Sequence, residues 1–346
     1  MTERPDLLTN PRSDRVRMVK RLSGRSARLR HGQFLVEGPQ GVREAVRHAP
    51  ERVRDLYLTE DAAERHPEIL AAAHGAVAHI HVATPEVLAA MSGDAQGVLA
   101  VVRAEAASLP DRGLRLVAVL PWAADPGNLG TIVRAADAAG ADAVVLGPGS
   151  VEPLNPKAVR STAGSLFHLP VVPVEDLART VASLRADGVQ VLAAAADGEW
   201  DLDTLADAAL RAGPLPAGPL PADSRIPPDS RIPAPTLPAD SRIPPDSRLP
   251  APTLPADSRI PPDSRIPAPT LPADSRIPPR NRAAAMPDLR RPTAWLFGNE
   301  AHGLRPEERD LADAVVGVPI HGLAESLNVA TAATLCLYAS ARAQRR

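Results

Sequence analysis

Three short segments combine glycines with amide, guanidinium, hydroxyl or carboxylate side chains at spacings that could bind a ligand or orient a substrate. In the first, Asp125–Arg134, Asn128 precedes Arg134 by six residues. Asn128 is a good helix N-cap, and Gly127 and Gly130 permit a tight turn with close backbone approach. The alternative is an ordinary strand–helix loop with a surface arginine.

The second segment, Leu296–Leu304, contains a carboxylate between two glycines. Gly298 and Gly303 bracket Glu300 directly after an expected strand. This pattern suits a loop that wraps a ligand through its backbone groups and holds Glu300 inside. A simple glycine-rich turn would have the same spacing.

The third segment, Val318–Val329, presents three different side chains where a strand gives way to a helix. Ser326 offers a hydroxyl, Leu327 an apolar contact and Asn328 an amide. Ser326 is the expected N-cap of the last helix, which we predict over Ser326–Ala343.

Alternating strands and helices must position these segments. Apolar runs predict strands that alternate with helices, and this pattern indicates a doubly wound parallel sheet with ligands at the carboxyl ends of its strands. The predicted strands are Leu114–Leu120, Ala143–Leu146, Leu169–Val172, Val189–Ala194, Thr293–Phe297 and Val315–Val318, and the predicted helices are Asn128–Ala139, one starting over Pro156–Ser161, and Val174–Ala186.

Residues 13–106 predict a separate small α/β sandwich with three layers, preceded by a flexible N-terminus over residues 1–12. Its expected strands are Gln33–Glu37, Val53–Leu58, Ala76–Val82 and Gly97–Val102, and its expected helices are Asp14–Leu29, Pro39–His48 and Pro85–Met91. The boundary between the two domains is expected near Glu105–Gly113, so that the second domain covers residues 113–346.

A proline-rich repeat interrupts the second domain. The 17-residue unit at Leu220–Thr236 recurs at Leu237–Thr253 and Leu254–Thr270, and Leu271–Pro279 is a truncated copy. Proline at this density blocks helices and central strands, and the segment has no aromatic residue with which to build a core. We therefore predict a disordered insertion over residues 212–285, partly in the polyproline II conformation.

Composition excludes several classes of protein. No run of about 18 apolar residues is present, so no membrane span is expected. The single cysteine, Cys336, excludes a disulfide framework and a cysteine-based metal site, and no metal is expected. The polar N-terminus lacks the apolar core of a signal peptide, which favours a soluble cytoplasmic protein.

Basic residues gather at the N-terminus although the net charge of the whole chain is only −2. The first thirty residues contain the basic side chains Arg4, Arg12, Arg15, Arg17, Lys20, Arg21, Arg25, Arg28 and Arg30 against the acidic Glu3, Asp6 and Asp14. This local excess favours contact with phosphates, with a solvated helix face as the alternative.

Taken together and in this order, the three segments resemble the motifs of the SpoU/TrmH branch of the SPOUT methyltransferases. Asn128–Arg134 is similar to the first motif, Phe297–Leu304 to the second (Gly-x-Glu-x-x-Gly-Leu) and Val318–Val329 to the third, which ends Ser-Leu-Asn-Val. The resemblance covers residues 13–200 and 287–343 and does not include the repeats.

The resemblance implies a methyltransferase domain with a deep trefoil knot, a homodimer with sites near the subunit interface, and S-adenosylmethionine as the cofactor. Gly298, Val318 and Leu327 would line the cofactor, mostly through backbone atoms. The last helix and the helix of the first motif would pack at the dimer interface, which leaves Cys336 a plain core role.

The resemblance also implies transfer of the methyl group to a ribose 2′-hydroxyl of RNA, with Arg134 activating that hydroxyl. Because arginine is effectively always protonated, Arg134 more easily binds the substrate phosphate and stabilises the developing alkoxide. Asn128, Glu300, Ser326 and Asn328 would then orient Arg134 and the nucleotide.

In the resembled family a separate N-terminal domain of this type accompanies members that modify ribosomal RNA, so the resemblance implies large-subunit ribosomal RNA, with guanosine as the preferred nucleotide. A transfer RNA 2′-O-methyltransferase and a non-catalytic RNA-binding protein of the same fold are the alternatives within the family. A dinucleotide-binding enzyme is the alternative outside it, because Gly147-Pro-Gly149 begins a GxGxxG motif, but Glu152 replaces the third glycine.

Overall fold

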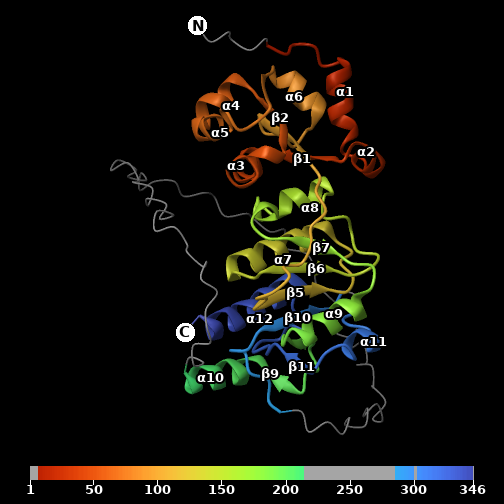
Figure 1. The fold of residues 1–346 in the computed structure, drawn as a ribbon, viewed down its shortest axis with the longest axis vertical. Coiled ribbons are helices and arrows are strands. Elements are labelled where there is room, and N and C mark those ends of the chain that lie inside the picture. The colour runs from red at the N-terminus through yellow and green to blue at the C-terminus, as the bar shows by residue number, and fades with distance from the viewer. Residues whose placement is uncertain (1–6, 214–284, 300–301, 346) are drawn as a thin grey trace, which may run out of the picture. The chain divides into compact units, whose positions relative to one another are not determined.

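Two β-sheets organise the residues that the computed structural model describes, which are 7–213, 285–299 and 302–345 (Figure 1). The first sheet has four strands in the order β1-β4-β2-β3. β4 pairs antiparallel with β1 and β2, and β3 pairs parallel with β2. The strands are β1 (Gln33–Glu37), β2 (Val53–Leu58), β3 (His79–Val82) and β4 (Val98–Arg103).

Helices cover both faces of the first sheet, as the three-layer prediction requires. On one face, α1 (Asp14–Arg21) and α6 (Pro85–Met91) pack on alternate residues of β1, β2 and β4. The other face packs against α3 (Pro39–His48), α4 (Glu60–Arg65) and α5 (Pro67–Ala73). The remaining helical segments are α2 (Arg25–His31) and the 3₁₀ turn η1 (Pro50–Arg52).

The predicted helix Asp14–Leu29 is wrong, because the chain forms two helices there. Leu22 is completely buried in the core, and Gly24 has extended backbone angles that end one helix before the next begins. The sequence analysis also missed α4 and α5. Thr59 caps α4 by accepting the Ala62 amide, and Pro67 occupies the first turn of α5.

The second sheet has seven strands, all paired in parallel, in the order β7-β6-β5-β10-β8-β11-β9. The expected parallel α/β architecture is therefore confirmed. The strands are β5 (Leu116–Leu120), β6 (Ala143–Leu146), β7 (Val171–Pro173), β8 (Gln190–Ala194), β9 (Trp200–Asp201), β10 (Thr293–Phe297) and β11 (Ala314–Gly317). β10 comes late in the sequence but lies between β5 and β8 at the centre of the sheet.

Alternate residues of the central strands point to opposite faces of this sheet, and each face has its own core. One core contains Trp295 and Phe297 with residues of α7 (Pro126–Ala139), α10 (Leu202–Ala212) and α12 (Val329–Gln344). The opposite core packs α9 (Leu177–Ala186) and residues near α11 (Pro306–Arg309) on the sheet. The other helical segments are α8 (Pro156–Ser161) and η2 (Ser165–Phe167).

Both helices of the predicted motifs begin elsewhere than expected. α7 begins at Pro126, and its N-cap is Asp125 rather than Asn128. α12 begins at Val329, and its N-cap is Asn328 rather than Ser326. In both cases another Asx side chain accepts the first free amides, so Asn128 lies inside α7 and Ser326 lies before α12.

Cys336 has the expected core role. Its side chain is completely buried in α12, within the core that also contains Trp295, and burial raises the pKa of its thiol. The neutral thiol acts there as a small apolar group.

Salt bridges join the first sheet region to the second. The Arg28 guanidinium is 4% exposed and donates to both Glu152 carboxylate oxygens, at 3.1 and 2.6 Å. Glu37 at the end of β1 accepts a hydrogen bond from Arg160 of α8. Arg28 therefore has a structural partner and is not available for the phosphate contact that the basic N-terminus predicts.

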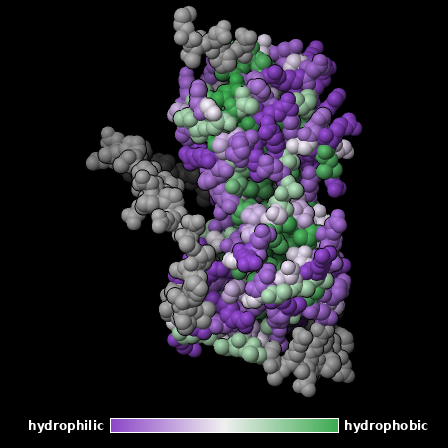
Figure 2. Space-filling model, viewed as in Figure 1, coloured by the Kyte–Doolittle hydropathy of each residue, from purple (hydrophilic) through white to green (hydrophobic). Residues whose placement is uncertain are grey.

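Polar residues dominate the face of the molecule seen in Figure 2, with hydrophobic residues in small groups between them. No helix of the described residues is both long and apolar enough to cross a membrane.

Candidate active site

A cavity of about 360 Å³ opens where β8, β10 and β11 end. Its walls include Gly298, Val318, Ser326 and Leu327, so four of the predicted site residues from two distant motifs line one space. A concave site at the carboxyl ends of parallel strands is the usual ligand position in a doubly wound sheet.

The loop after β10 closes on itself at the cavity wall. The Asn299 amide donates to the Gly303 carbonyl at 3.0 Å, and the Gly303 amide donates to the Asn299 carbonyl at 2.7 Å. A Cβ atom at Gly298 would lie 2.3 Å from the Gly303 carbonyl carbon, so only glycine fits where the loop returns. Gly303 has φ +64°, a conformation that also favours glycine. Glu300, the predicted carboxylate of this loop, lies outside the described residues.

The first and third motifs meet through two asparagines. The Asn328 Nδ2 atom donates to Asn128 Oδ1 at 3.3 Å, across 200 positions of sequence. The Asn328 Oδ1 atom accepts the Ala330 amide at 2.8 Å and caps α12. Asn328 therefore fixes the start of α12 and holds the Asn128 amide with one side chain.

Asp125 binds the backbone amide of Asn128, whereas Asn328 binds its side chain. Its carboxylate accepts the Asn128 amide at 2.8 Å and lies 3.4 Å from Lys157 Nζ. The backbone hydrogen bond from Asn128, followed by the Lys157 interaction, keeps the pKa of the Asp125 carboxyl below its ordinary value. Asp125 thus stays ionised where α7 begins, which the helix dipole favours.

Two smaller hollows lie beside the cavity, at the two asparagines. Gly298 and Asn299 line both the cavity and a small recess under the β5–α7 loop, and Asn128 lines that recess as well. Asn128 and Asn328 then border an open depression of about 280 Å³ between α7 and α12.

Arg134 does not line this cavity. It lies on the exposed face of α7 together with Thr131, six residues beyond Asn128, which is about 9 Å along a helix. Among the described residues, its guanidinium makes no hydrogen bond or ion pair. Its charge is therefore available to a group outside the chain.

The sequence analysis missed the segment after β8, which forms another cavity wall. Ala194, Ala195, Ala196 and Asp197 line the cavity, as does Arg309. The Arg309 guanidinium donates to both Asp197 oxygens at 3.0 and 2.9 Å, and this hydrogen bonding keeps the pKa of the Asp197 carboxyl below its ordinary value. The position of this segment directly after a parallel strand was the available signal.

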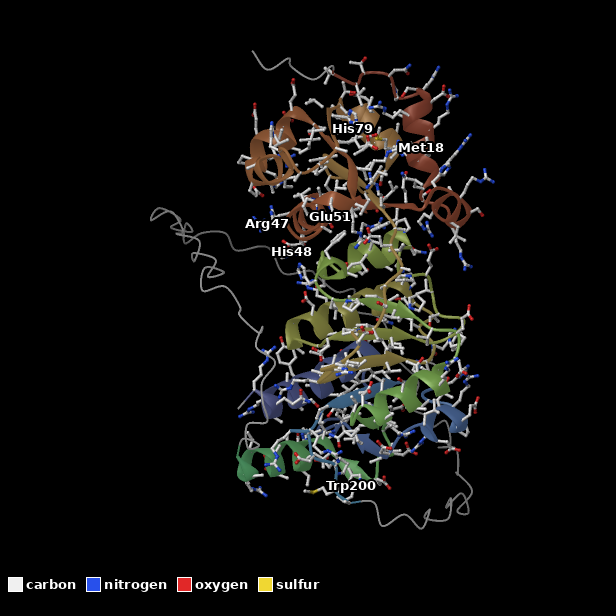
Figure 3. All side chains as sticks on the ribbon, in the orientation of Figure 1. Met18, Arg47, His48, Glu51, His79 and Trp200 are labelled. Atoms are coloured by element: carbon white, nitrogen blue, oxygen red, sulfur yellow. The ribbon has the colours of Figure 1, made fainter. Side chains whose placement is uncertain are left out.

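One group of side chains in the described residues could approach a metal ion, and it lies outside this cavity. Glu44, His48 and His168 place potential ligand atoms within 4.8 Å of one another. His48 is labelled on α3 in Figure 3. Both histidines already lie against the Glu44 carboxylate: Glu44 Oε2 is 3.3 Å from His48 Nε2 and 3.2 Å from His168 Nε2. None of the three lines the cavity, and the prediction of no metal stays a prediction.

The geometry does not favour the dinucleotide-binding alternative. A dinucleotide fingerprint needs its glycine loop to lead directly into a helix whose N-terminus faces the pyrophosphate. Here Gly147 and Gly149 follow β6, but α8 begins only at Pro156. Glu152, in place of the third glycine, is engaged by Arg28.

Comparison with protein families gives two matches that together cover both sheets. The SpoU rRNA Methylase family matches residues 115–212 and 271–338. The family described as RNA 2′-O ribose methyltransferase substrate binding matches residues 35–107.

Individual relatives agree with these matches. The 23S rRNA (guanosine(2553)-2′-O)-methyltransferase RlmP of Bacillus subtilis is 34% identical over 194 residues, covering 53% of this chain and 71% of its own. A 23S rRNA (uridine(2479)-2′-O)-methyltransferase of Streptomyces viridochromogenes is 26% identical over 331 residues, covering 93% of this chain and 86% of its own. The crystal structure of the SpoU methyltransferase AviRb from the same organism, in complex with AdoMet, superposes with a TM-score of 0.63 at 26% identity, covering 95% of this chain and 98% of that one.

Proposed function

Because the chain belongs to the SpoU rRNA methylase family, we propose that it transfers a methyl group from S-adenosylmethionine to a ribose 2′-hydroxyl of large-subunit ribosomal RNA. The observation that carries this proposal is the meeting of the motifs, since Gly298, Val318 and Leu327 line one cavity beside the Asn128–Asn328 pair. A ribosomal RNA substrate agrees with the predicted cytoplasmic location.

The cavity suits S-adenosylmethionine in size and in chemistry. Its volume of about 360 Å³ falls within the range of small-molecule sites. Its walls combine apolar side chains with backbone groups of the closed β10 loop, and these suit an adenine ring that is held by apolar contacts and a few hydrogen bonds. When bound, the cofactor supplies an electrophilic methyl group on a positively charged sulfur.

We assign cofactor binding to Gly298, Val318 and Leu327, mostly through backbone atoms. Val318 and Leu327 come from the segment between β11 and α12, whereas Gly298 follows β10. A site built from backbone atoms of two loops depends on how closely the loops approach each other. Side-chain identity then matters most where a larger residue would separate them, as at Gly298.

Asn128, Ser326, Asn328 and Glu300 are proposed to orient the target nucleotide and Arg134. The two asparagines support this role best, because their amides bind each other where Asn128 borders the recess next to the cavity and both border the open depression between α7 and α12. Holding the ribose close to the methyl group is itself a large part of catalysis, because it removes the entropy cost of the encounter.

Arg134 is proposed to bind an RNA phosphate and stabilise the developing alkoxide. A guanidinium remains protonated at neutral pH, so it is a poor base and a good anion ligand. Its exposed position without a partner among the described residues suits an anion that arrives with the substrate. The proton of the 2′-hydroxyl would leave through the phosphate that Arg134 holds.

The exposed cations of α1 and α2, and of the segment just before α1, are proposed to contact the RNA backbone. Arg12, Lys20, Arg21 and Arg30 are solvent-exposed on the first domain. Contacts of this kind position the RNA rather than specify its sequence. The relatives act on guanosine in one case and on uridine in the other, and we retain guanosine as the preferred nucleotide.

A homodimer is proposed through the exposed face of α12 with the neighbouring face of α7. Leu335 and Tyr338 are 45% and 49% exposed, although they lie in a helix whose other side is core. Thr331 and Arg342 continue the same stripe at helical spacing. The knot of the resembled family is proposed as well, supported by the insertion of β10 between β5 and β8.

The predicted disordered insertion over 212–285, which contains the proline-rich repeats, lies largely outside the described residues, and its disorder stays a prediction from composition. Deleting residues 214–279 should leave cofactor binding intact, because the segment contains no predicted site residue. Calorimetric titration of the shortened protein with S-adenosylmethionine tests this. Loss of the soluble dimer would instead show that the repeats pack on the enzyme.

Methyl transfer itself is tested with labelled S-adenosylmethionine and ribosomal RNA that lacks 2′-O-methylation. We expect incorporation into the large-subunit RNA at one ribose, located by mapping of 2′-O-methyl positions. Transfer to transfer RNA alone would support the alternative substrate. Cofactor binding without transfer to any ribosomal or transfer RNA would contradict the catalytic assignment.

A further inference from the structure

An exposed tryptophan borders the proposed site, in a chain that has only three tryptophans, three phenylalanines and two tyrosines. Trp122 follows β5 by two residues and is 42% exposed. The other large exposed aromatic side chain is Tyr338 on the proposed dimer face. An exposed indole needs an explanation, because exposure leaves a large apolar surface in water.

The indole of Trp122 is held rigidly. Its Nε1 atom donates to the Gly149 carbonyl at 3.1 Å. Its ring also lies against Gly149, where a Cβ atom would come within 3.8 Å of Cδ1. The only hydrogen-bond donor of the ring is thus satisfied inside the protein, and what faces solvent is aromatic surface.

The loop that carries Trp122 is fastened to the loop after β6. The Ala123 amide donates to Ser150 Oγ at 3.0 Å, and the Val151 amide donates to the Ala123 carbonyl at 2.8 Å. A Cβ atom at Gly147 would lie 2.2 Å from the Pro121 carbonyl oxygen, so the two backbones are in direct contact. The ring is therefore positioned before any ligand binds, and little conformational entropy remains to be lost on binding.

Trp122 lies beside the proposed site. It lines the same recess as Asn128, Gly298 and Asn299, and the last two of these also line the cavity. Lys157 on α8 has its ammonium 3.4 Å from Asp125, which lines the same recess, and its side chain is 60% exposed. An aromatic face next to a cation is the usual combination for binding an unpaired nucleotide, whose base stacks while its phosphate is neutralised.

We propose that Trp122 is a stacking platform for an unpaired RNA base that neighbours the methylated nucleotide, with Lys157 contacting the adjacent phosphate. This inference rests on the proposed RNA substrate. The Trp122 ring is a binding element and takes no part in methyl transfer. The site requires a single-stranded or looped RNA segment, because a base inside a duplex has no free face to stack.

Replacement of Trp122 in the full-length protein separates stacking from other roles. Trp122→Leu keeps apolar bulk without an aromatic face, and Trp122→Phe keeps the face without the Nε1 hydrogen bond. The probe is a single-stranded oligoadenylate, and its dissociation constant is measured by fluorescence anisotropy. A base–aromatic stack predicts a loss of affinity of about 5- to 150-fold for Trp122→Leu and a much smaller loss for Trp122→Phe.

Tryptophan fluorescence provides a second readout that does not depend on catalysis. Oligoadenylate should quench the wild-type emission, and quenching should persist in Trp200→Phe but disappear in Trp122→Phe. Trp200 is a suitable control because it lies half-buried on β9 at the far edge of the sheet (Figure 3). Binding of S-adenosylmethionine should be the same in all variants.

Two results would overturn the proposal. One is wild-type affinity of Trp122→Leu for the oligonucleotide. The other is a change in the oligomeric state of Trp122→Leu, measured by sedimentation, which would make the ring a contact between copies of the chain. Because the binding assays need no methyl transfer, failure of the proposed catalytic function would leave the stacking result interpretable, and the reverse also holds.

Discussion

Replacing Gly298 with alanine should severely weaken cofactor binding, because the added methyl group has no room in the loop after β10. Its Cβ atom would lie 2.3 Å from the Gly303 carbonyl carbon, 2.5 Å from the Leu304 nitrogen and 2.7 Å from the Gly303 oxygen. All three are backbone atoms, so no side-chain rotation can relieve the contact.

The size of the effect follows from the movement that the methyl group forces. Carbon atoms pack comfortably only beyond about 3.5 Å, so the Gly303 backbone must retreat by about 1 Å. The two hydrogen bonds between Asn299 and Gly303, at 3.0 and 2.7 Å, cannot both survive that shift. Each contributes about 0.5–1.5 kcal/mol, so loss of both would cost the closed loop about 1–3 kcal/mol and lower cofactor affinity about 5- to 150-fold.

Two other glycines of the same region provide matched controls. A Cβ atom at Gly303 meets nothing within 4 Å, but φ is +64°, so Gly303→Ala should cost only about 1–2 kcal/mol of backbone strain. A Cβ atom at Gly322 also meets nothing, and no unusual φ is required there, so Gly322→Ala should bind the cofactor like wild type. The steric argument therefore predicts graded effects, largest at Gly298 and absent at Gly322.

Calorimetric titration with S-adenosylmethionine measures the three affinities, and circular dichroism reports whether each variant is folded. Overpacking of this kind costs about 1–3 kcal/mol of stability, which a domain of this size tolerates with a lower melting temperature. Wild-type affinity in a folded Gly298→Ala protein would refute the reasoning, as would equal losses in Gly298→Ala and Gly322→Ala.

Three further predictions concern individual side chains. Asn328→Ala should lower stability by about 1 kcal/mol, because the helix cap is lost. Asn328→Asp should keep the oxygen that caps α12 but lose the hydrogen bond to Asn128. An aspartate variant with the melting temperature of wild type and reduced methyl transfer would confirm the double role. In single-turnover assays, Arg134→Ala should greatly lower the rate of methyl transfer and leave cofactor affinity unchanged, and Arg134→Lys should recover only part of that rate. A fully active alanine variant would exclude Arg134 from catalysis. The hydrogen bonds from Arg309 lower the pKa of the Asp197 carboxyl, so its contribution to stability is present above the ordinary aspartate pKa of about 3.9 and is lost as pH falls through the lower folded value. In urea unfolding, the stability of Asp197→Asn should therefore be closer to that of wild type in this acid range than at pH 7. The difference should be at most about 1 kcal/mol, because the ion pair is largely exposed.

The strands could be predicted from the sequence more accurately than the helix ends. Gln33–Glu37, Val53–Leu58 and Thr293–Phe297 are confirmed at both boundaries, because nearly every residue in these runs is buried. A helix end instead depends on which of several competent side chains accepts the first amides. Asp125 was identifiable as the cap of α7, since Pro126 follows it in the favoured first position.

At the start of α12 the sequence offered no such signal. Ser326 and Asn328 are both good N-caps, and nothing local distinguishes them. Which of the two caps the helix depends on Asn128, 200 positions away, whose Oδ1 atom accepts a hydrogen bond from Asn328 Nδ2. A tertiary contact thus decides a local boundary, and no periodicity in the sequence could report it.

The motifs identified the residues around the cavity, but they could not show which of them one chain brings together. Gly298, Val318 and Leu327 line the same cavity, whereas Arg134 lies on the outer face of α7. The direction of Arg134 follows from the periodicity of α7, whose apolar residues Leu129, Ile132 and Val133 face the core and leave Arg134 on the outer face. A cation that essential to the proposed chemistry, without a partner among the described residues, needs an anion from outside the chain. The RNA phosphate provides that anion, so Arg134 is expected to become ordered in its catalytic position only when the substrate is bound.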